Sequence, residues 1–231
     1  MKNTLVVLIA ALALAAPAPA PAAEHAHGGG EDLTHMHDVP VIPNKQNEYT
    51  DKLQYGFRDK NADLSKKNGY FLDQAGNKVR LAGYRGKLVL MDFIYSDCKH
   101  GICQYLNKKM NFVAGKHKDR LGKDLVLVSL SFDDKDTPRT LSAFAANWES
   151  DPAKWAYLSG LAGDIIETCK EYGVAVRWNE KEGFFEHTVR TILIGRDGKV
   201  LKTYRGRDYK MQEAVDDIAN LLAGKPVSPP Q

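Results

Sequence analysis

The sequence has little excess charge of either sign, few cysteines and few long apolar runs. Its 32 Lys and Arg residues nearly balance 29 Asp and Glu residues, for a net charge of +3. No basic run with interleaved aromatics occurs either, which argues against a nucleic-acid partner. With 231 residues, of which 43% are hydrophobic, the chain is suited to one domain with a sizeable core.

The longest apolar run near the N-terminus, residues 5–16, is too short for a typical membrane span. It follows Lys2 and precedes the small residues Ala20-Pro21-Ala22. This pattern predicts a signal peptide over residues 1–22, cleaved near Ala22, with an uncleaved anchor as the alternative. We therefore expect an exported, periplasmic protein without a stable membrane span after cleavage, in a compartment that permits disulfides.

The remainder divides into three parts by composition. Residues 23–52 are polar and rich in Gly and His, which predicts a flexible arm. Residues 53–224 carry the periodic patterns of a folded domain, and residues 225–231 form a tail. Four of the seven histidines lie in the arm, where imidazole and thioether groups suit copper: His25, His27, His35 and His37, together with Met36.

Strands and helices alternate in the first half of the predicted domain. A hairpin turning at residues 75–77 precedes a continuous apolar strand over 87–95, a helix over 104–122 and a second buried strand over 124–132. A helix capped by Thr137, a short strand or loop, another helix, a hairpin turning at 196–198 and a terminal helix follow. This order predicts an α/β fold with a thioredoxin-like mixed sheet flanked by helices and an N-terminal β-hairpin extension.

Cys98 and Cys103 follow the first apolar strand, at the predicted start of its helix. Exposed N–H groups at a helix N-terminus favour a thiolate, which is both a nucleophile and a metal ligand. Four residues separate the cysteines, so a regular helix would point them apart, and the segment containing Gly101 must form a loop. Cys169, within a later helical pattern, is predicted to be a small buried apolar residue.

The cysteine pair can be tested against the ligand patterns of haem, zinc and copper sites. Residue 104 is Gln rather than His, which excludes a covalent haem site, and four zinc ligands are not evident. Two thiolates and one imidazole suit copper, because sulfur selects Cu(I) and imidazole helps to hold Cu(II). The best candidate for the imidazole is His187, just before a strong strand, although a structural or solvated histidine is an alternative there.

Five segments in order resemble the Sco/SenC family of thioredoxin-fold copper proteins. They are "LAGYRGKLVLMDFIYSDC", "VSLSFDDKDTPRTLSAFAANW", "KWAYLSG", "CKEYGVAVRW" and "EHTVRTILIGRDGKV", and the similarity runs from about Gly69 to Leu222. The resemblance implies copper bound by Cys98, Cys103 and His187. It also implies a role in assembling the binuclear copper site of cytochrome c oxidase.

The chain departs from the family pattern at the cysteines. The family normally has three residues between them, often with Pro after each, whereas this chain has four, with Lys99 and Gln104 in those places. The longer loop makes His100 a possible extra ligand, with an exposed loop histidine as the alternative. The acidic residues Asp133, Asp134 and Asp136 are predicted to form a solvated turn and helix cap.

Three functions compete. A metallochaperone would bind copper, as Cu(I) or Cu(II), and transfer it to a cytochrome c oxidase subunit or another copper protein by ligand exchange. A thiol–disulfide oxidoreductase would use Cys98 and Cys103 as a redox-active pair on a partner thiol protein. In a peroxidase, the peroxide substrate would oxidise one cysteine to sulfenic acid, and the other cysteine would resolve it as a disulfide. The segment around His187 lacks the Pro of thioredoxin-type reductases, which favours copper binding over plain thiol exchange.

Overall fold

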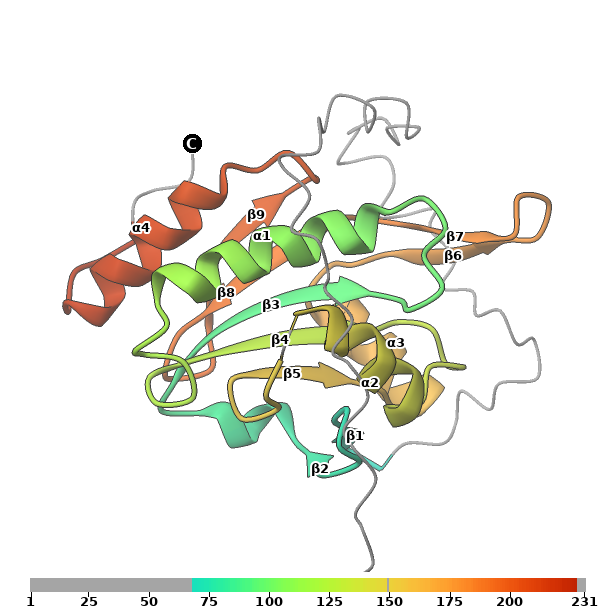
Figure 1. The fold of residues 1–231 in the computed structure, drawn as a ribbon, viewed down its shortest axis with the longest axis horizontal. Helices are drawn as coiled ribbons and strands as arrows, with labels where there is room; N and C mark the ends of the chain where they lie inside the picture. Colours follow the sequence, from blue (N-terminus) through green and yellow to red (C-terminus); the bar gives the residue numbers. More distant parts are fainter. Residues whose placement is uncertain (1–67, 149, 228–231) are drawn as a thin grey trace, which may run out of the picture. The chain divides into compact units, whose positions relative to one another are not determined.

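The computed structural model describes residues 68–148 and 150–227 (Figure 1). Nine strands lie in this part of the chain: β1 Phe71–Leu72, β2 Lys78–Val79, β3 Leu88–Ile94, β4 Leu125–Ser131, β5 Trp155–Leu158, β6 Val176–Asn179, β7 Phe184–His187, β8 Arg190–Ile194 and β9 Val200–Arg205. The α-helices are α1 Ile102–Lys116, α2 Pro138–Ala145, α3 Ala162–Glu171 and α4 Met211–Leu222. Two short 3₁₀ helices span Leu81–Tyr84 and Ala146–Trp148.

The main sheet has five strands in the order β5-β4-β3-β8-β9. Strands β3, β4 and β5 are parallel, and β8 and β9 run antiparallel to their neighbours. All seven residues of β3 are buried, as expected for the central strand of a sheet covered on both faces. Because the parallel strands end at the same edge, the loop after β3 and the loop after β4 meet there.

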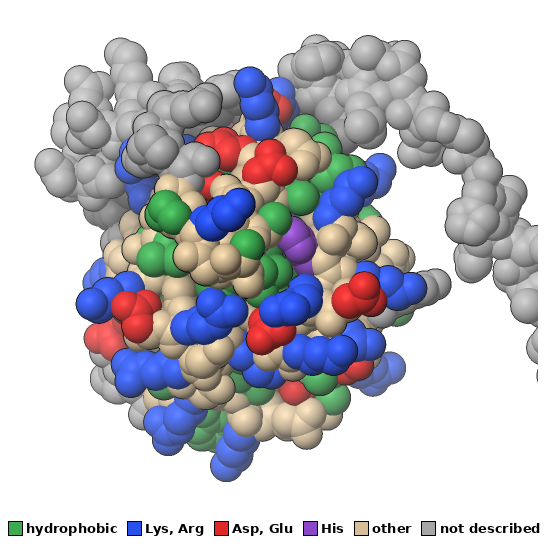
Figure 2. All heavy atoms as spheres, turned by 90° about the vertical axis from the view of Figure 1, so that its left-hand side faces the viewer, with side chains coloured by type: hydrophobic (Ala, Val, Ile, Leu, Met, Phe, Trp, Pro, Cys, Tyr) green, Lys and Arg blue, Asp and Glu red, His purple; other side chains and the backbone are tan. Residues whose placement is uncertain are grey.

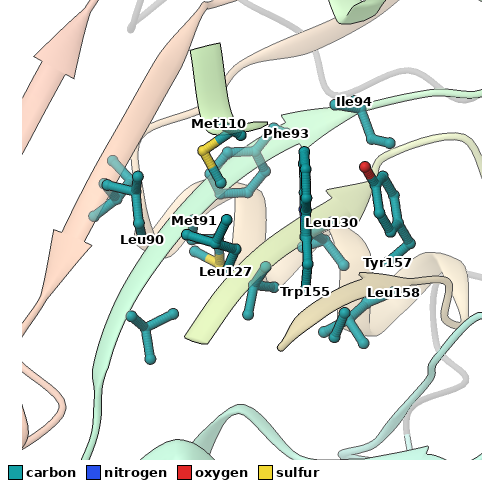
Figure 3. Close-up of a cluster of buried hydrophobic side chains, with 14 of the residues drawn as sticks. Leu90, Met91, Phe93, Ile94, Met110, Leu127, Leu130, Trp155, Tyr157 and Leu158 are labelled. Atoms are coloured by element: carbon teal, nitrogen blue, oxygen red, sulfur yellow. The ribbon is translucent and has the colours of Figure 1, made fainter. Parts of the chain in front are cut away.

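Helices cover both faces of this sheet. Helices α1 and α4 lie side by side across one face (Figure 1). On that face the Tyr157 hydroxyl of β5 donates to Asn107 of α1, and its ring packs on Phe144 of α2. Phe93 points to the other face, where its ring lies 6.1 Å from that of Tyr172 at the end of α3. Figure 3 shows the apolar side chains between the layers, with Trp155 and Tyr157 beside the leucines of β4 and β5.

One carboxyl group lies inside this apolar core. Asp92 of β3 is fully buried, and Ser129 of β4, directly opposite in the register, donates to it at 2.6 Å. The indole N–H of Trp155 donates to the same Ser129 oxygen at 2.9 Å. Burial raises the pKa of Asp92 to about 7. The carboxyl therefore carries its proton over a pH range in which an exposed aspartate is ionised.

Charged side chains gather at one end of the sheet. Lys and Arg side chains dominate the end away from the cysteines, with fewer Asp and Glu among them (Figure 2). They come from the loop after α1, the β8–β9 turn and the loop before β3, and include exposed Lys118, Lys123, Arg196 and Lys199. Among residues 68–148 and 150–227, no helix combines the length and the apolar character needed to cross a bilayer.

Most of the predicted elements are confirmed. The hairpin extension is β1–β2, the apolar strand is β3, and the hairpin turning at 196–198 is β8–β9. The capping of α2 by Thr137 is confirmed, since its hydroxyl accepts from Thr140 N–H. The short segment before α3 is the strand β5. The predicted leader and arm lie outside the described residues.

Two expectations are corrected and one is extended. The helix after the cysteines begins at Ile102 and ends at Lys116, because Cys103 already belongs to its first turn. His187 lies just before the strong strand β8, as predicted, and also ends a strand of its own, β7, because Phe184–His187 pairs with Val176–Asn179. Two of the acidic residues expected in a solvated turn, Asp133 and Asp136, are buried.

Candidate metal centre

The cysteine turn joins β3 to α1 at the edge where the parallel strands end. Cys98 O accepts a hydrogen bond from Gly101 N–H at 3.3 Å, and Gly101 has φ +70° before the helix begins at Ile102. This left-handed conformation suits Gly, so the sequence permits a tight turn here despite the four-residue spacer. The turn brings Cys98 back over the first turn of α1, next to Cys103.

The two thiols lie close enough to influence each other's ionisation. The Cys103 thiol foremost, with the backbone of the first turn of α1, lowers the pKa of Cys98 to about 7 against the effect of burial. Burial raises the pKa of Cys103, whose side chain is 0% exposed against 5% for Cys98. The pair therefore combines a thiolate-prone outer sulfur with a protonated inner one.

The buried side chain of Asp136, in the loop after β4, accepts hydrogen bonds from the start of the cysteine turn. Asp136 accepts hydrogen bonds from Ser96 N–H at 2.9 Å and from the Ser96 hydroxyl, and it also accepts from Ser131 at 2.6 Å. Ser96 lies two residues before Cys98, so these bonds fix the entry to the turn. Asp136 is thus a positioning group that sequence reasoning missed, although its place just before the capped helix α2 was a usable signal.

His187 lies on the hairpin β6–β7, beyond the same edge of the sheet. Its ring is buried, with its centroid 4.7 Å from that of Phe132 and 6.5 Å from that of Tyr95. Burial lowers the pKa of His187 to about 4, so the imidazole is neutral near pH 7. Nδ1 lies 3.3 Å from Thr188 O, and a carbonyl oxygen only accepts, so Nδ1 carries the proton. The lone pair of Nε2 is then available to a ligand.

The structure brings only part of the predicted ligand set together. Cys98 and Cys103 are neighbours at the β3–α1 turn, whereas His187 lies on the hairpin, with its ring edge-on to that of Tyr95. Across residues 68–148 and 150–227, no three His, Cys, Asp or Glu side chains are grouped closely enough to hold a metal ion as they stand. The arm candidates His25, His27, His35, Met36 and His37 lie outside the described residues.

The remaining candidates have defined places. His100 is exposed, and its ring meets that of Phe184 edge-on with centroids 4.4 Å apart. The loop between the cysteines therefore rests, through His100, against the hairpin that carries His187. Cys169 is buried in α3, as predicted for a small apolar residue, and burial raises its pKa to about 12.

Comparison with known proteins identifies the family. The SCO1/SenC family model matches residues 58–223. The chain belongs to the SCO1/SenC family. A curated SCO1 protein homolog from Bacillus subtilis is 34% identical over 139 residues, covering 59% of this chain and 71% of that protein. The family resemblance noted in the sequence is confirmed.

Solved structures of Sco proteins share the fold. BsSco, described as a member of the Sco family of cytochrome c oxidase assembly proteins with a disulfide switch, is 28% identical, with a TM-score of 0.55. The match covers 72% of this chain and 96% of BsSco. Bradyrhizobium japonicum ScoI with copper bound is 23% identical with a TM-score of 0.57, covering 65% of this chain and 94% of ScoI. These likenesses confirm the predicted thioredoxin-like α/β fold.

Proposed function

We propose that this SCO1/SenC protein is an exported metallochaperone that binds copper through Cys98, Cys103 and His187. The observation that carries the proposal is the pair of buried cysteines at the turn between β3 and α1, with a buried, neutral imidazole on the hairpin beyond the same sheet edge. Sulfur and neutral imidazole form a donor set that suits copper. The cargo would pass to an acceptor in assembly of the cytochrome c oxidase copper site, since BsSco is a member of the Sco family of cytochrome c oxidase assembly proteins.

The two cysteines would have different roles in copper binding and transfer. Cys98, the less deeply buried sulfur with the lowered pKa, would meet incoming or outgoing copper first. Cys103 must lose its proton to become the second ligand, because only the thiolate binds metal well. Both cysteines must be reduced for binding, so a Cys98–Cys103 disulfide would prevent it. Ligand exchange with an acceptor that offers its own thiols or imidazoles would then release the ion.

Substitution of His187 tests this site. We expect the reduced protein to retain near one equivalent of copper after gel filtration, and His187→Ala to lose it. His117→Ala is the matched control, since His117 is also buried but bonds Val215 O of α4 at 3.1 Å. The four arm histidines are replaced by Ala in every variant, so that copper bound by the arm does not contribute to the measurement. Stoichiometric copper in His187→Ala would exclude His187 as a ligand.

His100 has two possible roles that one pair of substitutions separates. If its ring matters only through the contact with Phe184, His100→Phe keeps copper binding and His100→Ala weakens it. If it is a ligand, both variants lose copper to a similar extent, because Phe offers no nitrogen. From the edge-on contact we expect the first result, with His100→Ala releasing copper ~3-fold to 10-fold faster in a chelator competition.

The asymmetry of the thiols supports a second function, thiol–disulfide exchange. The Cys98 thiolate would attack a partner disulfide and form a mixed disulfide, releasing one partner thiolate. Cys103, after losing its proton, would attack the Cys98 sulfur, release the second partner thiol and leave a Cys98–Cys103 disulfide. Two electrons pass from this chain to the partner, and the reverse sequence oxidises the partner.

A further inference from the structure

The loops at the end of the sheet away from the cysteines form one basic surface (Figure 2). Gly86 N–H, before β3, donates to Arg196 O of the β8–β9 turn at 2.8 Å. The Lys87 ammonium donates to Gly122 O, in the loop after α1, at 2.6 Å. These bonds join segments far apart in the sequence into a single face. We define the basic end as residues 85–87, 116–124, 151–154 and 196–199.

The basic end concentrates positive charge in a chain that is nearly balanced overall. It holds nine Lys and Arg residues against four Asp residues, whereas the whole chain has a net charge of only +3. Three of the four aspartates form ion pairs within the same loops: Arg120–Asp124, Lys154–Asp151 and Lys199–Asp197. Six further basic side chains share the surface with one aspartate, Asp119, which leaves a strong positive field.

Exposed apolar side chains flank the basic end. Val200 and Leu201 directly follow the β8–β9 turn and are 48% and 38% exposed, and Phe112 of α1 is 37% exposed. The Lys116 ammonium lies 5.2 Å from the centre of the Phe112 ring. These are three of the four large hydrophobic side chains exposed in the part of the chain that the structure describes. A lipid surface suits both kinds of side chain, whereas an acidic protein surface would match only the charges.

We propose that the basic end binds the surface of an anionic lipid bilayer. Exposed Lys118, Lys123 and Arg196 meet the anionic headgroups, and the flanking apolar side chains reach the boundary with the acyl chains. Each basic side chain near such a surface strengthens binding roughly fivefold, so a few of them together give a stable but reversible contact.

This contact would orient the candidate metal centre. The basic end and the cysteine turn lie at opposite ends of β3, whose seven residues span roughly 20 Å. With the basic end on the bilayer, the cysteine turn faces away from it. Under the proposed function, the acceptor would then present its copper site at a similar height above the membrane. The bilayer contact uses none of the proposed copper ligands, so it can be tested without copper.

Flotation with lipid vesicles tests the inference on the full chain. Vesicles of phosphatidylcholine with roughly a third phosphatidylglycerol should bind the protein more tightly than vesicles of phosphatidylcholine alone. Binding should weaken as salt is added, because salt screens the charges. The triple variant Lys118→Glu, Lys123→Glu and Arg196→Glu should bind the anionic vesicles at least ~100-fold more weakly, with the melting temperature of the parent.

The matched control reverses three exposed lysines outside the basic end. Lys135 follows β4, Lys181 lies in the β6–β7 turn, and Lys210 precedes α4. Replacing all three with Glu changes the net charge of the chain as much as the first variant does, and should leave most of the vesicle binding intact. Equal losses in the two variants would overturn the inference, since binding would then follow the net charge of the chain rather than the basic end.

Two other results would also overturn the inference. Equal binding to neutral and anionic vesicles would assign binding to apolar contacts that every variant retains. No binding to anionic vesicles would leave an acidic protein as the partner of the basic end. A parent protein that binds anionic vesicles through the basic end but holds no copper would support this inference while the proposed function fails.

Discussion

Replacing Cys98 with Ala is expected to remove copper from the folded protein. The variant loses a soft ligand and leaves Cys103 as a single buried sulfur, so copper affinity should fall by more than ~100-fold, beyond the loss from a supporting group. Cys103→Ala should have the same effect, because the two cysteines are neighbours at the β3–α1 turn and neither reaches a third cysteine. Metal analysis of the reduced protein, with the four arm histidines replaced by Ala, measures the change.

Cys169→Ala is the matched control for both variants. Cys169 is as buried as Cys103 but lies within α3, so its loss should leave copper stoichiometry unchanged. Near one equivalent of copper in Cys98→Ala would contradict the proposed site. The same variants decide the second function: turnover of a disulfide substrate, lost in both Cys98→Ala and Cys103→Ala, would establish an oxidoreductase. No turnover above background in the parent would exclude it.

Replacing Asp92 with Asn is expected to stabilise the fold at pH values above about 7. The folded-state pKa of this carboxyl, about 7, exceeds the value of ~3.9 for an exposed aspartate. Between these values the folded state binds a proton that the unfolded state has released, so the free energy of unfolding falls as pH rises. Asn removes this dependence and can still accept from Ser129, so we expect a gain of about 2 to 4 kcal/mol above pH 7.

Urea unfolding at a series of pH values measures this effect. The difference in free energy of unfolding between Asp92→Asn and the parent should grow as pH rises from ~4 to ~7 and then stay constant. Asp119→Asn is the control, because Asp119 is an exposed residue in the loop after α1. Parallel pH curves for Asp92→Asn and the parent would show that the Asp92 carboxyl is ionised in the folded protein.

The positions of the main strands could be predicted from local sequence signals. The apolar run 87–95 predicts a central strand because only a strand covered on both faces uses apolar residues without alternation, and β3 has that environment. Thr137 followed by Pro138 predicts a helix start because both residues act on the backbone next to them. The β6–β7 hairpin escaped prediction, since its short strands pair with each other outside the main sheet.

Sequence by itself determined the cysteine turn and its chemical character. A strand, a glycine and a following helix place Cys98 and Cys103 at a helix N-terminus, because these signals act over a few neighbouring residues. Only the tertiary structure decided what surrounds the turn. Asp136 holds Ser96, Phe184 packs on His100, and the rings of Phe185 and His187 pack edge-on against Tyr95 at the end of β3. These contacts join segments distant in the chain, and no local pattern encodes them, since they exist only once the sheet has brought its strand ends together.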